Sequence, residues 1–506
     1  MALVGIDVGG TGVKAVAYSE KGAELKQAYR EYSMKNPETG VYVFDPQAIY
    51  QAAESVLKEV TFGCGEEVLG IGCSSIGESF ICLDEIENVL CDSIMYFDTR
   101  GGEDVKEFLA KWPAEVLHKF ESWPPSRINS IIKMRVMSRE NPGFFSRVKR
   151  IRMLPDFILS RLGAGHVCDE SIAATVRAHN TLTSQWIPEM FEWAGLDYRL
   201  MPKIIPLGAE MGEVPERIAK EIGVKPGAKL VSGGHDHTAA SIGVGLTRVG
   251  QLMNEIGTVD FAMMLIGDSD LPKLRQPDGS RIGFRRHLGP GTYAINAGGG
   301  GLTGGAILRW FRDHFGLLEK AECERIGADF YAEYNKKFPK EPTDLIVLPQ
   351  FGTGLPGRDH TGAILNMTMS TTNEQIYRAF MECETFAVYT GLKYVNDNIR
   401  EVEDVIALGG GARSADYMQI RSDVFNAPVK TVNSDQAGTH GDAMLAGVAV
   451  GVWKDIEEAI EASVQIKETF EPNQKNHAYY MEMYEKYLRV YEAVNNALFP
   501  LHPVGL

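Results

Sequence analysis

Short apolar runs recur along the chain, and glycine-rich or polar turns separate them. Residues 2–8 and 13–18 form two such runs around a glycine-rich turn, so they predict two buried strands. Residues 68–74 predict another buried strand. Between these runs, residues 46–60 predict a helix with Pro46 at its first position, where proline is favoured. Strands and helices therefore both occur in the first part of the chain.

The rest of the chain repeats this design. Residues 229–231, 251–256 and 405–408 are apolar runs, and each leads to a turn that contains glycine. Residues 376–394 predict a long helix, and residues 102–200 are mainly helical, which predicts an inserted lobe. The repeated order of strand, glycine-rich turn and strand or helix predicts a duplicated phosphate-handling domain. A ligand would lie in the cleft between the two copies.

Composition and charge narrow the function classes. The 506 residues are too many for one core, and 44% are hydrophobic. No apolar stretch has the length of a membrane span, and the start lacks the basic region of a signal peptide, so we expect a cytoplasmic protein. The seven cysteines form no CxxC motif and are expected to be reduced. The net charge of −16 argues against nucleic acid as a partner. A homodimer remains open.

The first glycine-rich turn has the groups of a phosphate site. The backbone amides of residues 9–12 are expected to be exposed and to surround phosphate oxygens. Thr11 adds a hydroxyl and Lys14 a positive charge, while Asp7 at the strand end suits a magnesium ion bound through water. The alternative is an ordinary hairpin turn with a solvated lysine, and the residues alone do not decide between the two.

The segment 233–237, Gly-Gly-His-Asp-His, places one acid between two histidines after a predicted strand. Asp236 is well placed for a general base, because loop residues at strand ends are held by a rigid scaffold and still reach solvent. The alternative is that Asp236 caps the next helix. Of two other acids, Glu78 lies between two apolar strands and Asp98 lies at the end of another. Each would either accept a substrate hydroxyl or form a structural ion pair, for Asp98 with Arg100.

Together these motifs resemble the FGGY family of carbohydrate kinases, in the sugar-kinase, heat-shock ATPase and actin superfamily. The most specific match is the segment 409–414, which resembles the adenosine motif. Residues 7–14, 233–245 and 257–258 resemble the first phosphate, catalytic and second phosphate motifs. The resemblance covers nearly the whole chain and implies an α/β fold of two actin-like (ribonuclease H-like) domains with a central cleft, at about 1–245 and 246–506.

The resemblance also implies roles for individual residues. Asp236 would be the general base in phosphoryl transfer from ATP, and Asp7 with Asp236 would hold Mg²⁺. The implied nucleotide-binding residues lie in the glycine-rich turns and are Asp7, Gly9, Gly10, Thr11, Lys14, Gly257, Thr258, Gly305, Gly409, Gly410, Gly411, Ala412 and Ser414.

The implied acceptor is a small-molecule sugar or polyol that binds to Glu78, Asp98 and His237. Glu78 matches a glutamate of glycerol kinases, and Asp98 lies in a segment similar to one in pentulokinases. We therefore expect a xylulokinase-like enzyme that phosphorylates a ketopentose such as xylulose. The alternatives are a kinase for glycerol- or tetritol-type polyols and a non-catalytic sugar- or nucleotide-binding regulator on the same fold.

Overall fold

The structure is a computed structural model that describes residues 1–275, 282–302, 304–349, 351, 362–434 and 436–498. The chain forms two compact units, and neither is a single stretch of sequence. The first unit contains residues 1–247, 265–295 and 436–465. The second contains 248–264, 296–435 and 466–506. Both units therefore include segments from the second half of the chain.

The first unit is built on a six-stranded mixed sheet with the order β14-β15-β6-β1-β2-β3. Strands β1, β6 and β15 are parallel, and β2 pairs antiparallel to β1. The register places Asp7 of β1 and Gly234 of β15 on either side of Ser74 in β6. The sheet strands are β1 (Ala2–Val8), β2 (Gly12–Ser19), β3 (Glu24–Glu31), β6 (Val68–Ser75), β14 (Glu210–Glu213) and β15 (Lys229–His235).

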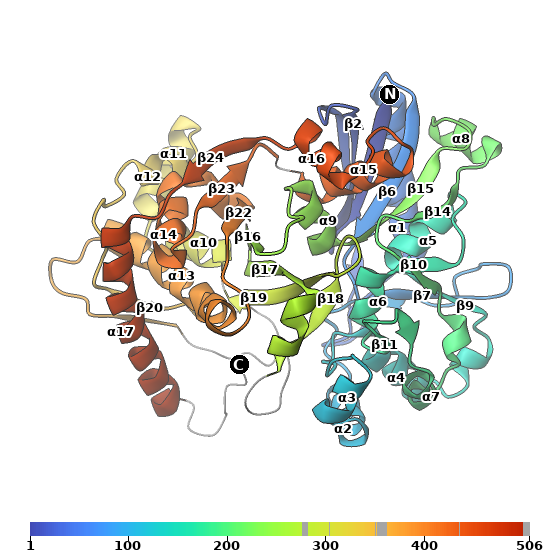
Figure 1. The fold of residues 1–506 in the computed structure, drawn as a ribbon, viewed down its shortest axis with the longest axis horizontal. Helices are drawn as coiled ribbons and strands as arrows, with labels where there is room; N and C mark the ends of the chain where they lie inside the picture. The colour runs from blue at the N-terminus through green and yellow to red at the C-terminus, as the bar shows by residue number, and fades with distance from the viewer. Residues whose placement is uncertain (276–281, 303, 350, 352–361, 435, 499–506) are drawn as a thin grey trace. The chain divides into compact units, whose positions relative to one another are not determined.

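Helices cover both faces of this sheet. Alternate residues of β1 point to opposite faces, as in any strand. Val4 and Ile6 pack in the cluster that includes α1 (Pro46–Gly63), whereas Leu3 packs with α15 (Ala437–Ala449). Figure 1 shows α15 beside β2 and β6 although it comes from the end of the chain. Asp7, four residues after Leu3, therefore lies on the α15 face.

The predicted helical lobe packs around its own apolar cluster, which includes Phe108, Trp112, Phe191 and Trp193. It also contains short strands that the helical pattern did not predict. The helices are α2 (Gly102–Lys111), α3 (Ala114–Lys119), α4 (Ser130–Glu140), α5 (Leu154–Ser160), α6 (Glu170–Val176) and α7 (Pro188–Ala194). The strands are β9 (Arg150–Met153), β10 (Val167–Asp169), β11 (His179–Asn180), β12 (Gln185–Trp186) and β13 (Lys203–Ile205).

The first unit also contains further short strands and helices. They are β4 (Met34–Lys35), β5 (Val43–Phe44), β7 (Phe80–Leu83), β8 (Ser93–Ile94), α8 (Glu216–Ile222), α9 (Asp236–Gly243), β18 (Phe284–Arg286) and α16 (Ile456–Ser463). The helix α1 begins at Pro46 as predicted, because Asp45 caps it by accepting the amide of Gln47 at 2.9 Å.

The second unit contains the strands β16 (Gln251–Ile256), β22 (Asp404–Leu408), β23 (Val429–Val432) and β24 (Ile466–Phe470). They are consecutive in a sheet of order β18-β19-β17-β16-β22-β23-β24, with β17 (Asp260–Gly267) and β19 (Thr292–Leu302). A separate pair is formed by β20 (Ile346–Leu348) and β21 (Ala363–Leu365).

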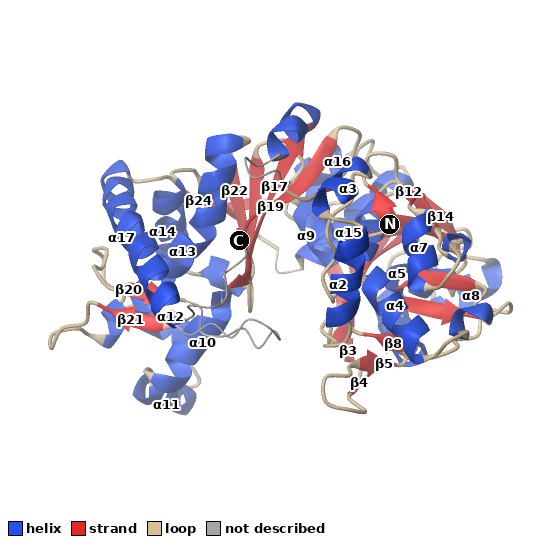
Figure 2. Cartoon of the chain, turned by 90° about the horizontal axis from the view of Figure 1, so that it is seen from below, coloured by secondary structure: helices blue, strands red, loops and turns tan. Residues whose placement is uncertain are grey.

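Long helices pack together in the second unit. Figure 2 shows α13 (Asn373–Asn398), α14 (Ala415–Phe425) and α17 (Gln474–Leu498) side by side. The predicted long helix at 376–394 is confirmed by α13, which extends a few residues further at each end. The shorter helices are α10 (Gly304–His314), α11 (Leu317–Ile326) and α12 (Phe330–Asn335). Within the described part of the chain, no helix is long and apolar enough to cross a membrane.

Candidate active site

Asp236 is the first residue of α9 and directly follows the last residue of β15. Two glycines make this sharp turn. Gly234 has a φ of +81°, a conformation that residues with a side chain rarely adopt. A Cβ at Gly233 would lie 1.7 Å from Oδ1 of Asp442, so no side chain fits there. The turn therefore places the Asp236 carboxylate at the carboxyl edge of the parallel strands.

Two nitrogen atoms contact one oxygen of the Asp236 carboxylate. Nδ1 of His235 lies 2.8 Å from Oδ1 of Asp236, and the backbone N–H of His237 donates to the same oxygen at 2.6 Å. Burial opposes ionisation of this carboxyl, but the charges of His235 and His237 and both hydrogen bonds favour it. The histidine charges and the hydrogen bonds outweigh the effect of burial and hold the pKa of Asp236 well below its usual value. Asp236 is therefore an ionised, partly exposed carboxylate that can accept a proton.

The first phosphate-type turn connects β1 and β2. The amide of Gly9 donates to the carbonyl of Gly12 at 3.0 Å, whereas Thr11 at the tip is exposed. Gly10 is partly exposed, and a Cβ there would meet only the end of Met95, at 4.0 Å. Lys14 is directly opposite Asp7 in the antiparallel pair, so the two side chains lie on the same face of the sheet. The turn thus combines a hydroxyl, an amine and a carboxylate.

In the second unit, the Gly257–Thr258 turn joins β16 to β17. The start of α10 packs directly on it, because the amides of Gly305 and Ala306 donate to the carbonyls of Gly257 and Thr258 at 2.7 and 3.2 Å. A Cβ at Gly305 would lie 2.8 Å from the Gly257 oxygen. Gly305 therefore allows the helix to approach the turn closely. Its amide is already used within the protein, so its predicted contact with nucleotide stays a prediction.

The segment 409–414 follows β22, the strand that pairs with β16, so it lies at the same sheet edge as Gly257. Gly409 has a φ of +88°, and a Cβ there would lie 2.6 Å from the Ile256 oxygen. Gly410 is exposed, and no atom of the described residues lies within 4 Å of an added Cβ. Ser414 caps α14 by accepting the Tyr417 amide at 3.3 Å. Gly410 thus presents bare backbone on which a flat ligand can pack, with Gly411 and Ala412 partly exposed beside it.

Glu78 lies close to Asp236. Gly77 packs so tightly that an added Cβ would be 2.9 Å from Cδ2 of His235. The Glu78 backbone has a φ of +62°, and its amide donates to Oγ1 of Thr175 at 3.0 Å. Burial raises the pKa of the Glu78 carboxyl, with His235 opposing and Asp236 adding to the rise. The fold therefore brings two of the predicted acids together. The rings of His235 and His237 stack with centroids 5.4 Å apart, so His237 also lies on the His235 side of this acid pair.

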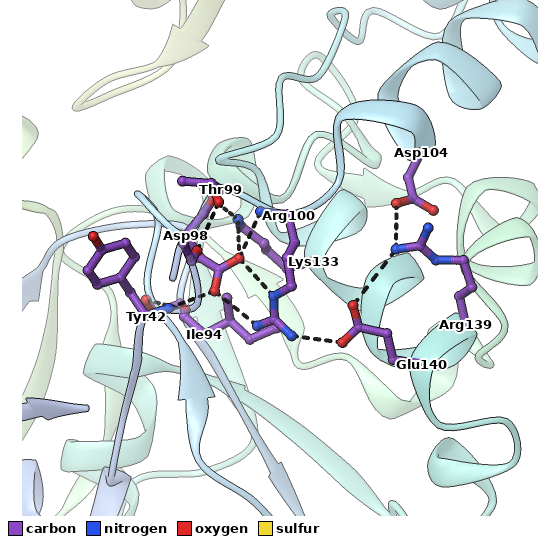
Figure 3. Close-up of polar contacts among 11 residues, drawn as sticks. Tyr42, Ile94, Asp98, Thr99, Arg100, Asp104, Lys133, Arg139 and Glu140 are labelled. Carbon is purple, nitrogen blue, oxygen red and sulfur yellow. Dashed lines mark hydrogen bonds and ion pairs between the residues drawn. The ribbon is translucent and has the colours of Figure 1, made fainter. Parts of the chain in front are cut away.

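Asp98 lies in an ion-pair cluster that Figure 3 shows in full. Arg100 donates to both carboxylate oxygens at 3.0 and 2.9 Å, and the amide of Tyr42 donates at 2.9 Å. Nζ of the buried Lys133 lies 3.6 Å from Oδ1 and donates to the Asp98 carbonyl at 2.6 Å. The Asp98 side chain has 0% of its surface exposed. Protein donors thus occupy this carboxylate, and its substrate role stays a prediction without a contact to support it.

Two arginines that the sequence analysis did not select lie beside Glu78. They are Arg177, directly after α6, and Arg285 of β18, and both interact electrostatically with Glu78. They are 99 and 207 positions from Glu78 in the sequence (177 − 78 and 285 − 78). No local motif marks either one, since only the packing of α6 against β18 brings them near Glu78.

Comparison with known proteins agrees with this organisation. Residues 2–243 match the N-terminal domain of the FGGY family of carbohydrate kinases, and residues 252–450 match its C-terminal domain. A xylulose kinase of Lactococcus lactis subsp. lactis is 26% identical over 97% of this chain and 96% of its own length. An autoinducer-2 kinase of Klebsiella pneumoniae subsp. pneumoniae is 24% identical over 97% and 93%.

The fold is also that of solved sugar kinases. The crystal structure of a xylulose kinase from Lactobacillus acidophilus superposes with a TM-score of 0.85, 22% identity and coverage of 98% and 99% of the two chains. The mixed α/β fold with two domains is therefore the actin-like ATPase fold of these kinases. Because the two family domains together match most of the chain, the protein belongs to the FGGY family and is an ATP-dependent carbohydrate kinase.

Proposed function

We propose that this kinase transfers the γ-phosphoryl group of ATP to a hydroxyl of a ketopentose such as xylulose, with Asp236 as the general base. The observation that carries the proposal is the ionised Asp236 carboxylate, held at the end of β15 by His235 and the His237 amide. Proton transfer to a positioned carboxylate assists attack by the hydroxyl oxygen. A protein that only binds sugar or nucleotide needs no such group, so we do not favour a regulator.

Each unit contributes its own groups to the reaction. In the first unit, the amides of residues 9–12, the Thr11 hydroxyl and Lys14 favour negatively charged phosphate oxygens. In the second unit, Thr258 and the exposed backbone at Gly410 favour the nucleotide. Phosphoryl transfer depends mainly on positioning and on neutralising charge, and these groups supply both.

Asp7 and Asp236 would hold a magnesium ion. Asp7 flanks Ser74 on the opposite side from Gly234, and strands are about 4.8 Å apart, so the backbones at the two sites are about 10 Å apart. Among the described residues, no group of three acidic, histidine or cysteine side chains is arranged to hold a metal ion by itself. Mg²⁺ typically binds one or two carboxylates, water and substrate phosphates. When bound, the ion neutralises phosphate charge.

The acceptor is proposed from two observations. The relatives named xylulose kinase align over nearly the whole chain at 21–26% identity, and this supports a ketopentose. Glu78 resembles a glutamate of glycerol kinases and lies near Asp236, which favours a glycerol- or tetritol-type polyol as the second candidate. Both acceptors offer several hydroxyls to a site rich in carboxylate and imidazole groups.

A coupled assay of ADP release over ketopentoses, ketohexoses, polyols and aldonates tests the proposal. We expect turnover with a ketopentose, and a fall in kcat of about 10²–10⁴-fold in Asp236→Asn with nucleotide affinity retained. Asp397→Asn is the control, because Asp397 is exposed and its ion pair is with Lys393 on the surface of α13. Full activity in Asp236→Asn would refute the role of this residue, and no response to any acceptor would favour the regulator.

A further inference from the structure

The start of α6 is hydrogen-bonded to the turn that carries Asp236. Oδ1 of Asp169, the cap of this helix, accepts the amides of Ser171 and Ile172 at 2.7 and 3.2 Å. The same oxygen accepts the Ser171 hydroxyl at 2.6 Å. Because that hydroxyl proton is used by Asp169, Oγ of Ser171 is left as an acceptor, and it accepts the backbone N–H of His235 at 2.9 Å.

The second oxygen of Asp169 bonds to β15 directly. Oδ2 accepts the hydroxyl of Ser232 at 2.8 Å, and Asp169, Ser171 and Ser232 are all buried. A Cβ at Gly234 would lie 2.5 Å from Oγ of Ser171, so the turn also packs against this serine. The Asp169 carboxylate therefore holds the strand before the glycine turn, and through Ser171 it holds the residue after the turn.

The last turn of α6 holds the backbone of Glu78. Oγ1 of Thr175 accepts the Glu78 amide at 3.0 Å and donates to the carbonyl of Ile172 at 2.8 Å. On the other side, the hydroxyl of Ser130 in α4 donates to the Glu78 carbonyl at 2.7 Å. A non-glycine residue keeps a positive φ, here +62°, only where its surroundings determine it. These two hydrogen bonds do so for Glu78.

The helix sets the spacing between the two contacts. Ser171 and Thr175 are four positions apart, so they lie on the same face of α6, about 6 Å apart along its axis. Gly77 lies between the two contacted segments. A Cβ there would be 2.4 Å from Cγ2 of Thr175 and 2.9 Å from Cδ2 of His235. The helix, the Glu78 segment and the Asp236 turn are therefore in direct packing contact.

We infer that α6 aligns the acceptor with the general base. Ser171 and Asp169 are positioning residues for Asp236. Thr175 is the positioning residue for Glu78. The inference rests on the proposed function, because it takes Asp236 as the base and Glu78 as an acceptor ligand. The base must lie within hydrogen-bond reach of the hydroxyl proton, and a misplacement of about 1 Å lowers the rate about 10²-fold. One helical turn fixes this distance.

Two substitutions one helical turn apart should have different kinetic effects. Ser171→Ala leaves the His235 amide without its acceptor, so kcat should fall about 10–100-fold while the KM for the acceptor changes less than about threefold. Thr175→Val keeps the side-chain shape but leaves the Glu78 amide unpaired, so the KM for the acceptor should rise about tenfold while kcat changes less than about threefold. Initial rates with a ketopentose and with glycerol, at saturating ATP, measure both constants.

Matched controls remove a helical hydroxyl elsewhere in the first unit. Ser463→Ala loses a bond to the Ala459 carbonyl of 2.6 Å in α16. Thr61→Val loses a bond to the Leu57 carbonyl of 2.9 Å in α1. Neither should change kcat or the KM for the acceptor. Thr175→Ser retains the hydroxyl and should restore the wild-type KM.

Hydrogen exchange followed by mass spectrometry tests the same contacts without turnover. The amides of residues 233–237 should exchange at least about tenfold faster in Ser171→Ala, with residues 76–80 unchanged. Thr175→Val should show the reverse pattern. Circular dichroism checks that each variant folds. Asp169→Asn, which keeps a helix cap but replaces one carboxylate oxygen by an amide group, and Thr175→Ala replace a variant that unfolds.

The outcomes separate this inference from the proposed function. Equal changes of kcat and of the KM for the acceptor in Ser171→Ala and Thr175→Val would overturn the inference and leave the proposed function intact. Unchanged exchange of both segments would also overturn it. If the wild-type protein phosphorylates neither acceptor, the proposed function fails, and the exchange pattern still decides whether α6 holds the two segments.

Discussion

Nδ1 of His235 lies 2.8 Å from Oδ1 of Asp236, so the cap of α9 is bonded to the first residue of the same helix. The histidine is itself fixed, because its backbone N–H donates to Oγ of Ser171 at 2.9 Å. This short chain of contacts keeps the Asp236 carboxylate oriented and ionised. The glycine turn before it allows the geometry, and the two histidines, whose role the motif alone left open, supply the electrostatics.

His235→Gln should move the acid limb of the pH profile of kcat/KM to higher pH. The native contacts depress the pKa of Asp236, so the carboxylate stabilises the folded state above its unfolded pKa, and this contribution is lost as the pH falls. Removing the imidazole raises that pKa, and a shift of about one pH unit corresponds to about 1.4 kcal/mol. The pH profile of kcat/KM, extended below the ordinary pKa of an aspartate, measures it. His314→Gln is the control, and an unchanged acid limb would contradict the assignment.

Lys133→Met and Asp98→Asn should lower the free energy of unfolding without a selective effect on the acceptor KM. Breaking a buried ion pair costs about 3–5 kcal/mol, and we expect about 3 kcal/mol for Lys133→Met because Arg100 still pairs with Asp98. Urea denaturation measures the loss. Lys106→Met, in an exposed pair with Glu103, should cost less than about 1 kcal/mol. A raised acceptor KM with unchanged stability would instead place Asp98 in the substrate site.

Gly409 and Gly410 should respond differently to a side chain. Gly409→Ala introduces a Cβ at a φ of +88° and 2.6 Å from a carbonyl oxygen, so we expect a loss of about 1–3 kcal/mol of stability. The added Cβ of Gly410→Val has no atom of the described residues within 4 Å, so the Tm should stay unchanged, while the side chain should raise the KM for ATP about tenfold, or about 1.4 kcal/mol of binding. Thermal unfolding and ATP saturation curves measure the two effects. A normal KM for ATP in Gly410→Val would remove this segment from the nucleotide site.

Lys14→Met should raise the KM for ATP about tenfold, because a charge-assisted hydrogen bond to phosphate contributes about 1.5–3 kcal/mol. Lys14 is opposite Asp7 on the same sheet face, next to the phosphate-type turn. Lys21→Met removes an equal charge from the exposed turn between β2 and β3 and should change nothing. Initial rates at varied ATP with saturating acceptor measure the effect. Equal behaviour of the two variants would mean that Lys14 is simply solvated.

Local sequence patterns predict the order of strands and glycine-rich turns, the start of α1 at Pro46 and the position of Asp236 after a strand. These features depend on neighbours in the chain, such as a proline at a helix start or two glycines in one turn. The packing of distant segments is what brings the charges of Glu78, Arg177 and Arg285 within reach of one another, and it encloses Asp98 between Arg100 and Lys133. The physical reason is that burial and charge pairing depend on segments far apart in sequence, whose packing no local pattern encodes.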